Sequence, residues 1–188
     1  MIPDNIVIGE KDMGLLQRLL KAATHDHSNS HSKFLRQILV TVDITAPEFW
    51  WSEFDTYKVG TVANSTSKMH KGLARPLTRE DFEVEWESLS EEEKAIFDDH
   101  IHILNTFREK NKSAETPEEK EYWWRRWLTM VPMSYLQTRT VTLNYQVLRQ
   151  MLKDRRHHKL PEWREDFVNW VETLPYAKEL IMYEGDNS

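Results

Sequence analysis

The sequence predicts a helix-rich α/β (α+β) domain that spans residues 1–188 and ends in a C-terminal tail from residue 176. A chain of 188 residues is long enough for one domain with a hydrophobic core. One segment alternates apolar and polar residues as a β-strand does, whereas several longer segments repeat apolar residues at helical spacing. Eight tryptophans and seven phenylalanines supply large apolar side chains for the core.

The first expected elements are a helix over residues 11–24 and a strand over residues 38–44. The apolar residues of the helix share one face, and they are Leu15, Leu16, Leu19, Leu20 and Ala23. The strand is rich in β-branched residues, and one of its faces consists of Ile38, Val40, Val42 and Ile44. Pro47 then fits the first turn of a helix that carries Trp50 and Trp51.

Capping patterns mark two further helices, which begin after Ser90 and after Thr116. The first of these is expected over residues 91–109. A long helical pattern follows within residues 133–156, with one apolar stripe formed by Val141, Tyr145, Leu148 and Leu152. A last amphipathic helix is predicted over residues 161–174.

Composition excludes several classes of function. The net charge of −6 argues against broad binding to nucleic acid, which requires a basic surface. The absence of cysteine excludes disulfides, thiolate metal sites and cysteine nucleophiles. No apolar run approaches membrane-spanning length, and no secretory signal precedes the first helix. We therefore expect a cytoplasmic protein that does not bind membranes.

The segment 47–70 mixes large aromatic residues with charged, amide and hydroxyl groups. This mixture is typical of a pocket with an apolar body and a few placed polar groups. Its notable residues are Trp50, Trp51, Glu53, Asp55, Tyr57, Lys58, Asn64, Ser67, Lys68 and His70. The alternative interpretation is an amphipathic helix that turns into a polar loop.

Three other patterns each allow a functional and a structural interpretation. The loop with His25, Asp26, His27 and His31 has ligand types suited to zinc or iron, but it also reads as a solvated loop. The aromatic residues over 122–128 favour a core or subunit interface over a cofactor stack. The basic residues over 149–159 indicate either a phosphate or carboxylate site or a solvated helix end.

The motifs of the second half resemble those of the flavin-dependent thymidylate synthases. The matching residues are Val131-Pro132-Met133, Thr142-Leu143-Asn144, Leu148, Met151 and Arg155. The first half is similar over the histidine loop, with His25 and His31 at the histidine positions and His27 at the hydroxyl position. It is similar again at Ala46-Pro47-Glu48-Phe49, and Asn64 and Ser67 keep their places in the following signature. In that signature, Lys58 stands for one arginine, Ser65 for the glutamate, Met69 for the last arginine and His70 for the tyrosine.

The resemblance implies a fold, an assembly and a set of ligands. The fold would be a central mixed or antiparallel sheet with flanking helices, as in the thymidylate synthase-complementing proteins. The assembly would be a homotetramer with sites shared between subunits. The ligands would be FAD and the small-molecule nucleotide dUMP, with NADPH and methylenetetrahydrofolate as co-substrates in dUMP methylation.

The resemblance also implies roles for individual residues. Arg155 would be the catalytic residue that polarises or orients the base. FAD would be held by His27, His31, Lys58, Asn64 and Asn144. The nucleotide would be held by Glu53, Ser67, Lys68, Arg139 and Arg155. The alternative functions are a non-catalytic or respecialised nucleotide-binding or interaction protein on the same scaffold, and a metal-dependent enzyme that uses the histidine loop.

Overall fold

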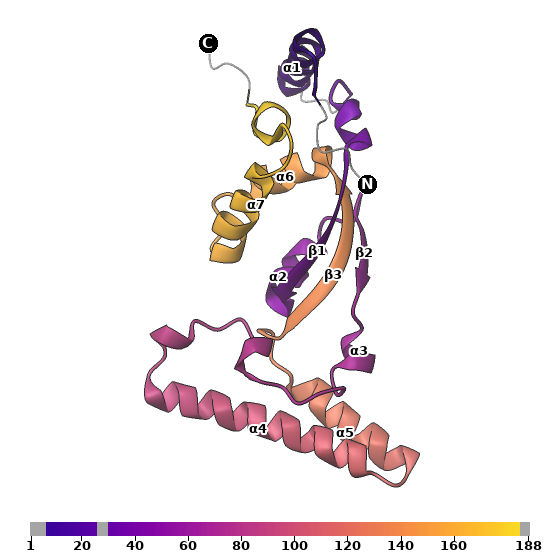
Figure 1. Ribbon diagram of the computed structural model, residues 1–188, viewed down its shortest axis with the longest axis vertical. Helices are drawn as coiled ribbons and strands as arrows, with labels where there is room; N and C mark the ends of the chain where they lie inside the picture. Colours follow the sequence, from indigo (N-terminus) through magenta and orange to yellow (C-terminus); the bar gives the residue numbers. More distant parts are fainter. Residues whose placement is uncertain (1–6, 26–29, 185–188) are drawn as a thin grey trace. The chain divides into compact units, whose positions relative to one another are not determined.

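Three strands form one sheet in the computed structural model of this chain, in the order β1-β3-β2 (Figure 1). Their bounds are Leu39–Pro47 for β1, Val62–Ser65 for β2 and Leu136–Asn144 for β3. Strands β1 and β3 are antiparallel, because Thr41 Oγ1 lies 3.0 Å from Thr142 Oγ1 while Thr45 Oγ1 lies 2.8 Å from Thr138 Oγ1. The predicted strand over 38–44 is therefore confirmed.

The structure describes residues 7–25 and 30–184, apart from the side chains of Thr24, His25 and His70. The chain divides into two compact units by its internal contacts. Unit 1 comprises residues 1–42, 57–62 and 141–188, and unit 2 comprises residues 43–56 and 63–140.

Unit 1 is mostly helical, and helix α6 is at its centre. Helix α6 makes contacts with η1, α7 and η5, and η5 in turn contacts α1. The bounds are α1 (Glu10–His25), the 3₁₀ helix η1 (Lys33–Gln37), α6 (Tyr145–Arg155), the π-helix η4 (Glu162–Phe167), α7 (Val168–Glu172) and the π-helix η5 (Ala177–Ile181). The predicted helix over 11–24 is confirmed as α1. The region expected as a tail contains η5, whose Ala177, Leu180 and Ile181 are buried.

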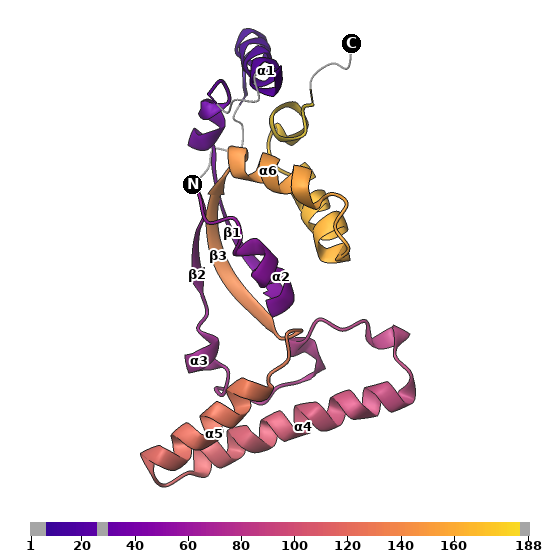
Figure 2. The same ribbon diagram turned by 180° about the vertical axis from the view of Figure 1, so that it is seen from behind.

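Unit 2 contains the long helical hairpin α4–α5, whose helices lie side by side in both views (Figures 1 and 2). The bounds are α2 (Glu48–Phe54), α3 (Lys68–Lys71), the 3₁₀ helices η2 (Arg79–Asp81) and η3 (Trp86–Ser88), α4 (Glu91–Ser113) and α5 (Pro117–Met130). Ser90 and Glu93 form the predicted capping box at the start of α4, and the Thr116 side chain caps α5. Between these helices, Trp127 is 1% exposed.

The long helix expected within residues 133–156 is wrong in its first half. Residues 136–144 form strand β3, and the helix α6 begins only at Tyr145. The side chains of Thr138, Thr140 and Thr142 each form a hydrogen bond with a side chain of β1. Pairing with β1 therefore stabilises this segment as a strand, which its β-branched residues also favour. Asn144 ends the strand and caps the helix by accepting a hydrogen bond from the Val147 N–H at 3.1 Å.

Helix α2 is amphipathic and its tryptophans belong to the core. Trp50, Trp51 and Phe54 are 3%, 0% and 3% exposed, respectively. Trp50 meets Trp51 edge-on at 4.8 Å between ring centroids and stacks on Phe54 at 5.4 Å. The structural interpretation of this part of segment 47–70 is therefore confirmed, because a large ligand could not reach these rings without unpacking them.

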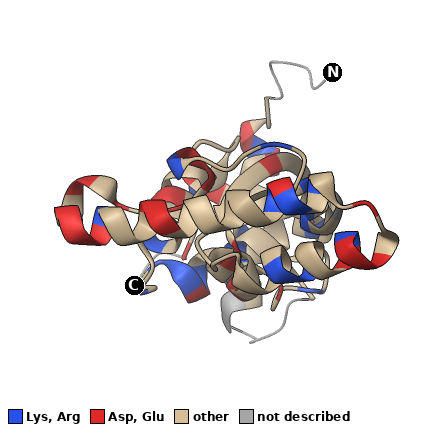
Figure 3. Cartoon of the chain, turned by 90° about the horizontal axis from the view of Figure 1, so that it is seen from below, with Lys and Arg blue, Asp and Glu red and all other residues tan. Residues whose placement is uncertain are grey.

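Charged residues of both signs are interspersed along the helices seen in Figure 3. Acidic residues gather in the first turn of α4, where Glu91, Glu92 and Glu93 are favoured by the helix dipole. Within the described ranges 7–25 and 30–184, no helix is both long enough and apolar enough to cross a membrane.

Candidate functional site

The loop 57–61 and helix α6 form the part of unit 1 where the predicted residues Asn144 and Arg155 lie. Gly60 has φ +82°, and a Cβ at this position would lie 3.1 Å from both Asn144 Nδ2 and Val147 Cγ2. Glycine is thus required by the left-handed backbone and by the close approach to the start of α6. The approach places the loop against buried Asn144, which is 8% exposed.

Arg155 ends helix α6 and is held by aromatic rings. Its Nε donates a hydrogen bond to Tyr57 Oη at 2.9 Å. Its guanidinium carbon lies 5.4 Å from the centroid of the Tyr57 ring and 5.3 Å from that of Trp163. Cation–π contacts of this kind restrict a long side chain that would otherwise be mobile. The guanidinium is therefore held in place at the end of α6 by the phenol and the two rings.

Tyr57 is a residue of this site that the sequence interpretation did not assign, and Trp163 is another. Burial raises the pKa of its phenol, and the hydrogen bond from Arg155 opposes that rise without cancelling it. The phenol is therefore neutral near pH 7 and donates to Asp154 Oδ2 at 3.3 Å. Its presence in segment 47–70 was visible in the sequence, but nothing there linked it to a residue 98 positions later.

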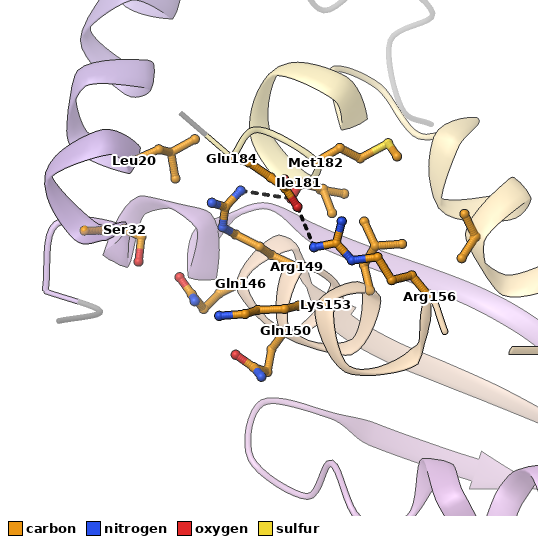
Figure 4. A pocket seen from close by; sticks show the side chains of 13 residues that line it. Leu20, Ser32, Gln146, Arg149, Gln150, Lys153, Arg156, Ile181, Met182 and Glu184 are labelled. Atoms are coloured by element: carbon orange, nitrogen blue, oxygen red, sulfur yellow. Dashed lines mark hydrogen bonds and ion pairs between the residues drawn. The ribbon is translucent and has the colours of Figure 1, made fainter. Parts of the chain in front are cut away.

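The opposite face of α6 lines a pocket of about 800 Å³, which lies within unit 1 (Figure 4). Its walls combine cationic, amide and aliphatic side chains from α1, α6, α7 and the end of the described chain. They include Arg149, Lys153, Arg156, Gln146, Gln150, Glu184, Leu20, Ile181 and Met182. A pocket of this size and mixed lining can hold a small organic molecule. The basic residues noted in the sequence over 149–159 thus lie partly in a cavity.

In unit 2, Arg139 belongs to a fully connected cluster, which we call the Arg139 cluster and which consists of Trp51, Asp55, Gln137 and Arg139. Arg139 Nη1 lies 2.9 Å and 3.2 Å from the two carboxylate oxygens of Asp55, and its Nε donates to Gln137 Oε1 at 2.8 Å. Its guanidinium lies 4.3 Å from the Trp51 ring centroid. The indole Nε1 of Trp51 donates to the Gln137 carbonyl at 2.9 Å. The charge of Arg139 is therefore matched within its own cluster.

The other predicted residues of unit 2 are spread over several elements. Lys68 forms an ion pair with Glu48, at 3.1 Å between Nζ and Oε1. Ser67 precedes α3, Glu53 lies on α2 and Asn64 lies exposed on β2. Lys68 and Arg139 are thus both engaged by carboxylates, and a phosphate group would have to displace these to bind them.

Of the remaining predicted residues of unit 1, Lys58 is exposed in the loop beside α6 and His31 is exposed before η1. His27 lies outside the described residues, as do the side chain of His25 and residue Asp26. In the part of the chain that the structure describes, no three His, Asp or Glu residues lie close enough together to hold a metal ion.

Comparisons with known proteins identify the fold. No family model matches the sequence, and no curated protein matches it either. Among solved structures, the chain is similar to thymidylate synthase X from Helicobacter pylori with FAD and dUMP, with a TM-score of 0.63 and 18% identity over 92% of this chain and 82% of that one. A second structure, of the flavin-dependent thymidylate synthase of the same organism complexed with FAD and dUMP, gives 0.64 and 17% identity over 92% and 83% of the two chains. The chain therefore has the helix-rich α+β fold of these enzymes, as predicted.

Proposed function

We propose that this chain is a flavin-dependent enzyme that acts on a pyrimidine deoxynucleotide, with a reaction like that of the thymidylate synthases. The observation that carries the proposal is the fold, which 92% of the chain shares with enzymes solved with FAD and dUMP. A fold alone does not determine a reaction. The proposal therefore also draws on the residues of this chain that lie at the corresponding motifs.

The Arg155 site has the chemistry that a uracil base requires. The base is planar and carries carbonyl oxygens, which accept hydrogen bonds from a guanidinium. Arg155 Nε donates to Tyr57 Oη at 2.9 Å, so in this proposal the terminal nitrogens are the part of the guanidinium that would face the base. In this proposal Arg155 orients and polarises the base, and Tyr57 fixes the plane of the guanidinium.

The described residues fit a planar base better than they fit a phosphate at Lys68 or Arg139. Both cations are engaged by carboxylates, Glu48 and Asp55. Lys58 is exposed and could hold a phosphate, and Asn144 could donate from its Nδ2 to a flavin, since its Oδ1 already caps α6. FAD, when bound, would supply hydride chemistry, with NADPH as reductant and methylenetetrahydrofolate as one-carbon donor.

The proposed assembly is a homotetramer in which sites are shared between subunits. Sedimentation of the purified protein tests this part separately. A tetramer supports it, whereas a monomer would mean that one chain must supply every ligand contact.

The proposed function is tested by adding FAD to the purified protein and recording its visible absorption spectrum. We expect a shifted oxidised-flavin band, which NADPH then bleaches in the presence of dUMP. The variant Arg155→Ala should weaken dUMP binding about tenfold or more, since it removes charge-assisted hydrogen bonds. Arg164→Ala is the matched control, because Arg164 is exposed and pairs with its neighbour Glu165.

A second function is favoured by the ion pairs of Lys68 and Arg139. If these cations stay engaged, the scaffold could bind a nucleotide without flavin chemistry, as a respecialised nucleotide-binding protein. An unperturbed FAD spectrum together with dUMP binding that depends on Arg155 would favour this function over the redox enzyme.

A further inference from the structure

The cavity beside helix α6, which we call the α6 pocket, is lined by more cationic than anionic side chains. Arg149, Lys153 and Arg156 line it, and Glu184 is the one carboxylate among the described lining residues. Arg156 forms an ion pair with Glu184. The pKa of that carboxyl is lowered first by Arg156 and further by Arg149 and Lys153. Three cations therefore line the same pocket, and a single negative charge does not balance them.

Arg149 is the most constrained of the three cations. Its Nη1 donates to the main-chain carbonyls of Ile181 at 2.9 Å and Leu180 at 3.4 Å. Burial lowers the pKa of its guanidinium, and Glu184 opposes that shift. A cation in such surroundings is stabilised by any further anion that enters the pocket.

The rest of the lining indicates an organic ligand rather than a bare ion. Leu20, Ile181 and Met182 supply an apolar wall. Gln146 Oε1 is buried and has no hydrogen-bond partner among the described residues, so it can accept from a donor on a ligand. Figure 4 shows Arg149 and Arg156 on the two sides of Ile181 and Glu184. The cationic and apolar parts thus face the same cavity.

We propose that the α6 pocket binds an organic phosphate, whose phosphate group meets Lys153 and Arg156 and whose body lies against the apolar wall. Without a ligand, the Glu184 carboxylate pairs with Arg156 at the position that the phosphate group would take. The inference is independent of the proposed flavin function, because Arg155 lies about 160° around the helix from Lys153.

Calorimetric titration tests the inference with two probes, phenyl phosphate and inorganic phosphate, at a pH where both are dianions. We expect phenyl phosphate to bind at least about fivefold more tightly than inorganic phosphate, because only phenyl phosphate has a ring that can be buried against the apolar wall. Failure of phenyl phosphate to bind, or equal affinity for the two probes, would overturn the assignment to an organic phosphate.

Three single substitutions separate ligand binding from a structural role. Lys153→Gln should weaken phenyl phosphate binding about tenfold, as expected for one charge-assisted hydrogen bond. Glu184→Gln should strengthen it several-fold, because it removes the competing carboxylate. Lys178→Gln is the matched control, since Lys178 is exposed in the same unit and does not line the pocket. A purely structural ion-pair network would instead give no gain for Glu184→Gln, and that result would overturn the proposal.

Discussion

The Arg139 cluster of unit 2 and the α6 pocket of unit 1 use similar residue types in opposite ways. In the Arg139 cluster, one guanidinium meets one carboxylate, one amide oxygen and one indole face. In the pocket, the lining holds three cations and one carboxylate, and a buried amide oxygen has no partner within the described residues. The first arrangement is complete without a ligand, whereas the second is stabilised by one.

The difference shows that an arginine next to aromatic and acidic residues is not enough to identify a binding site. The sequence interpretation placed Arg139 among the nucleotide-binding residues and left Arg149, Lys153 and Arg156 as an undecided basic run. A structural cluster differs from a binding site in whether neighbouring groups already match the charge and the hydrogen bonds of each cation. Three substitutions test this difference between the two clusters.

The largest effect is expected from Trp51→Ala, which removes the centre of the Arg139 cluster. Trp51 is 0% exposed and its indole donates to the Gln137 carbonyl. The loss of a fully buried tryptophan should lower the free energy of unfolding by about 3–5 kcal/mol. Urea denaturation followed by far-UV circular dichroism measures this value. Trp51→Phe should lose less, and a cost below about 1 kcal/mol for the alanine variant would contradict the packing role.

An intermediate effect is expected from Arg139→Met. The change removes an ion pair with Asp55, but about half of the Asp55 side chain is exposed, which limits its contribution. We expect a loss of about 1–2 kcal/mol from the hydrogen bonds and the contact with Trp51 together. A double-mutant cycle with Asp55→Asn isolates the pair. Zero coupling in that cycle would show that the charges are not matched to each other.

The smallest effect is expected from Lys153→Met in the pocket. Without ligand, this substitution removes one of three neighbouring cations, so the free energy of unfolding should change by no more than about 0.5 kcal/mol. The same denaturation experiment is used, so the value compares directly with that of Arg139→Met. A loss as large as that of Arg139→Met would mean that the two clusters do not differ, and that the pocket is structural.

The sequence predicted the helical parts of the fold well where local signals are strong. Ser90 with Glu93 and Thr116 with Pro117 mark the beginnings of α4 and α5, because capping depends on residues only three positions apart. The strand over 38–44 was also predicted, because apolar and polar residues alternate along it. Segment 136–144 was missed as a strand because its apolar residues also fit the helical spacing that continues into α6.

The candidate site was only partly predictable. Arg155 and Asn144 were assigned from the motif resemblance, and the structure describes their surroundings in unit 1. Tyr57 was not assigned, since its bond to Arg155 joins residues 98 positions apart. The engagement of Arg139 by Asp55 was equally hidden, because the two are 84 positions apart.

The caps, the amphipathic faces and the absence of cysteine chemistry all follow directly from the amino-acid sequence. These properties depend on residue type and on neighbours within a turn or two of the chain. Tertiary contacts were needed to establish that residues 136–144 pair as a strand, that Trp50 and Trp51 are core, and that three cations and one carboxylate line the same pocket. Such outcomes depend on which distant groups become partners, and pairing between distant groups leaves no periodic signal in a single sequence.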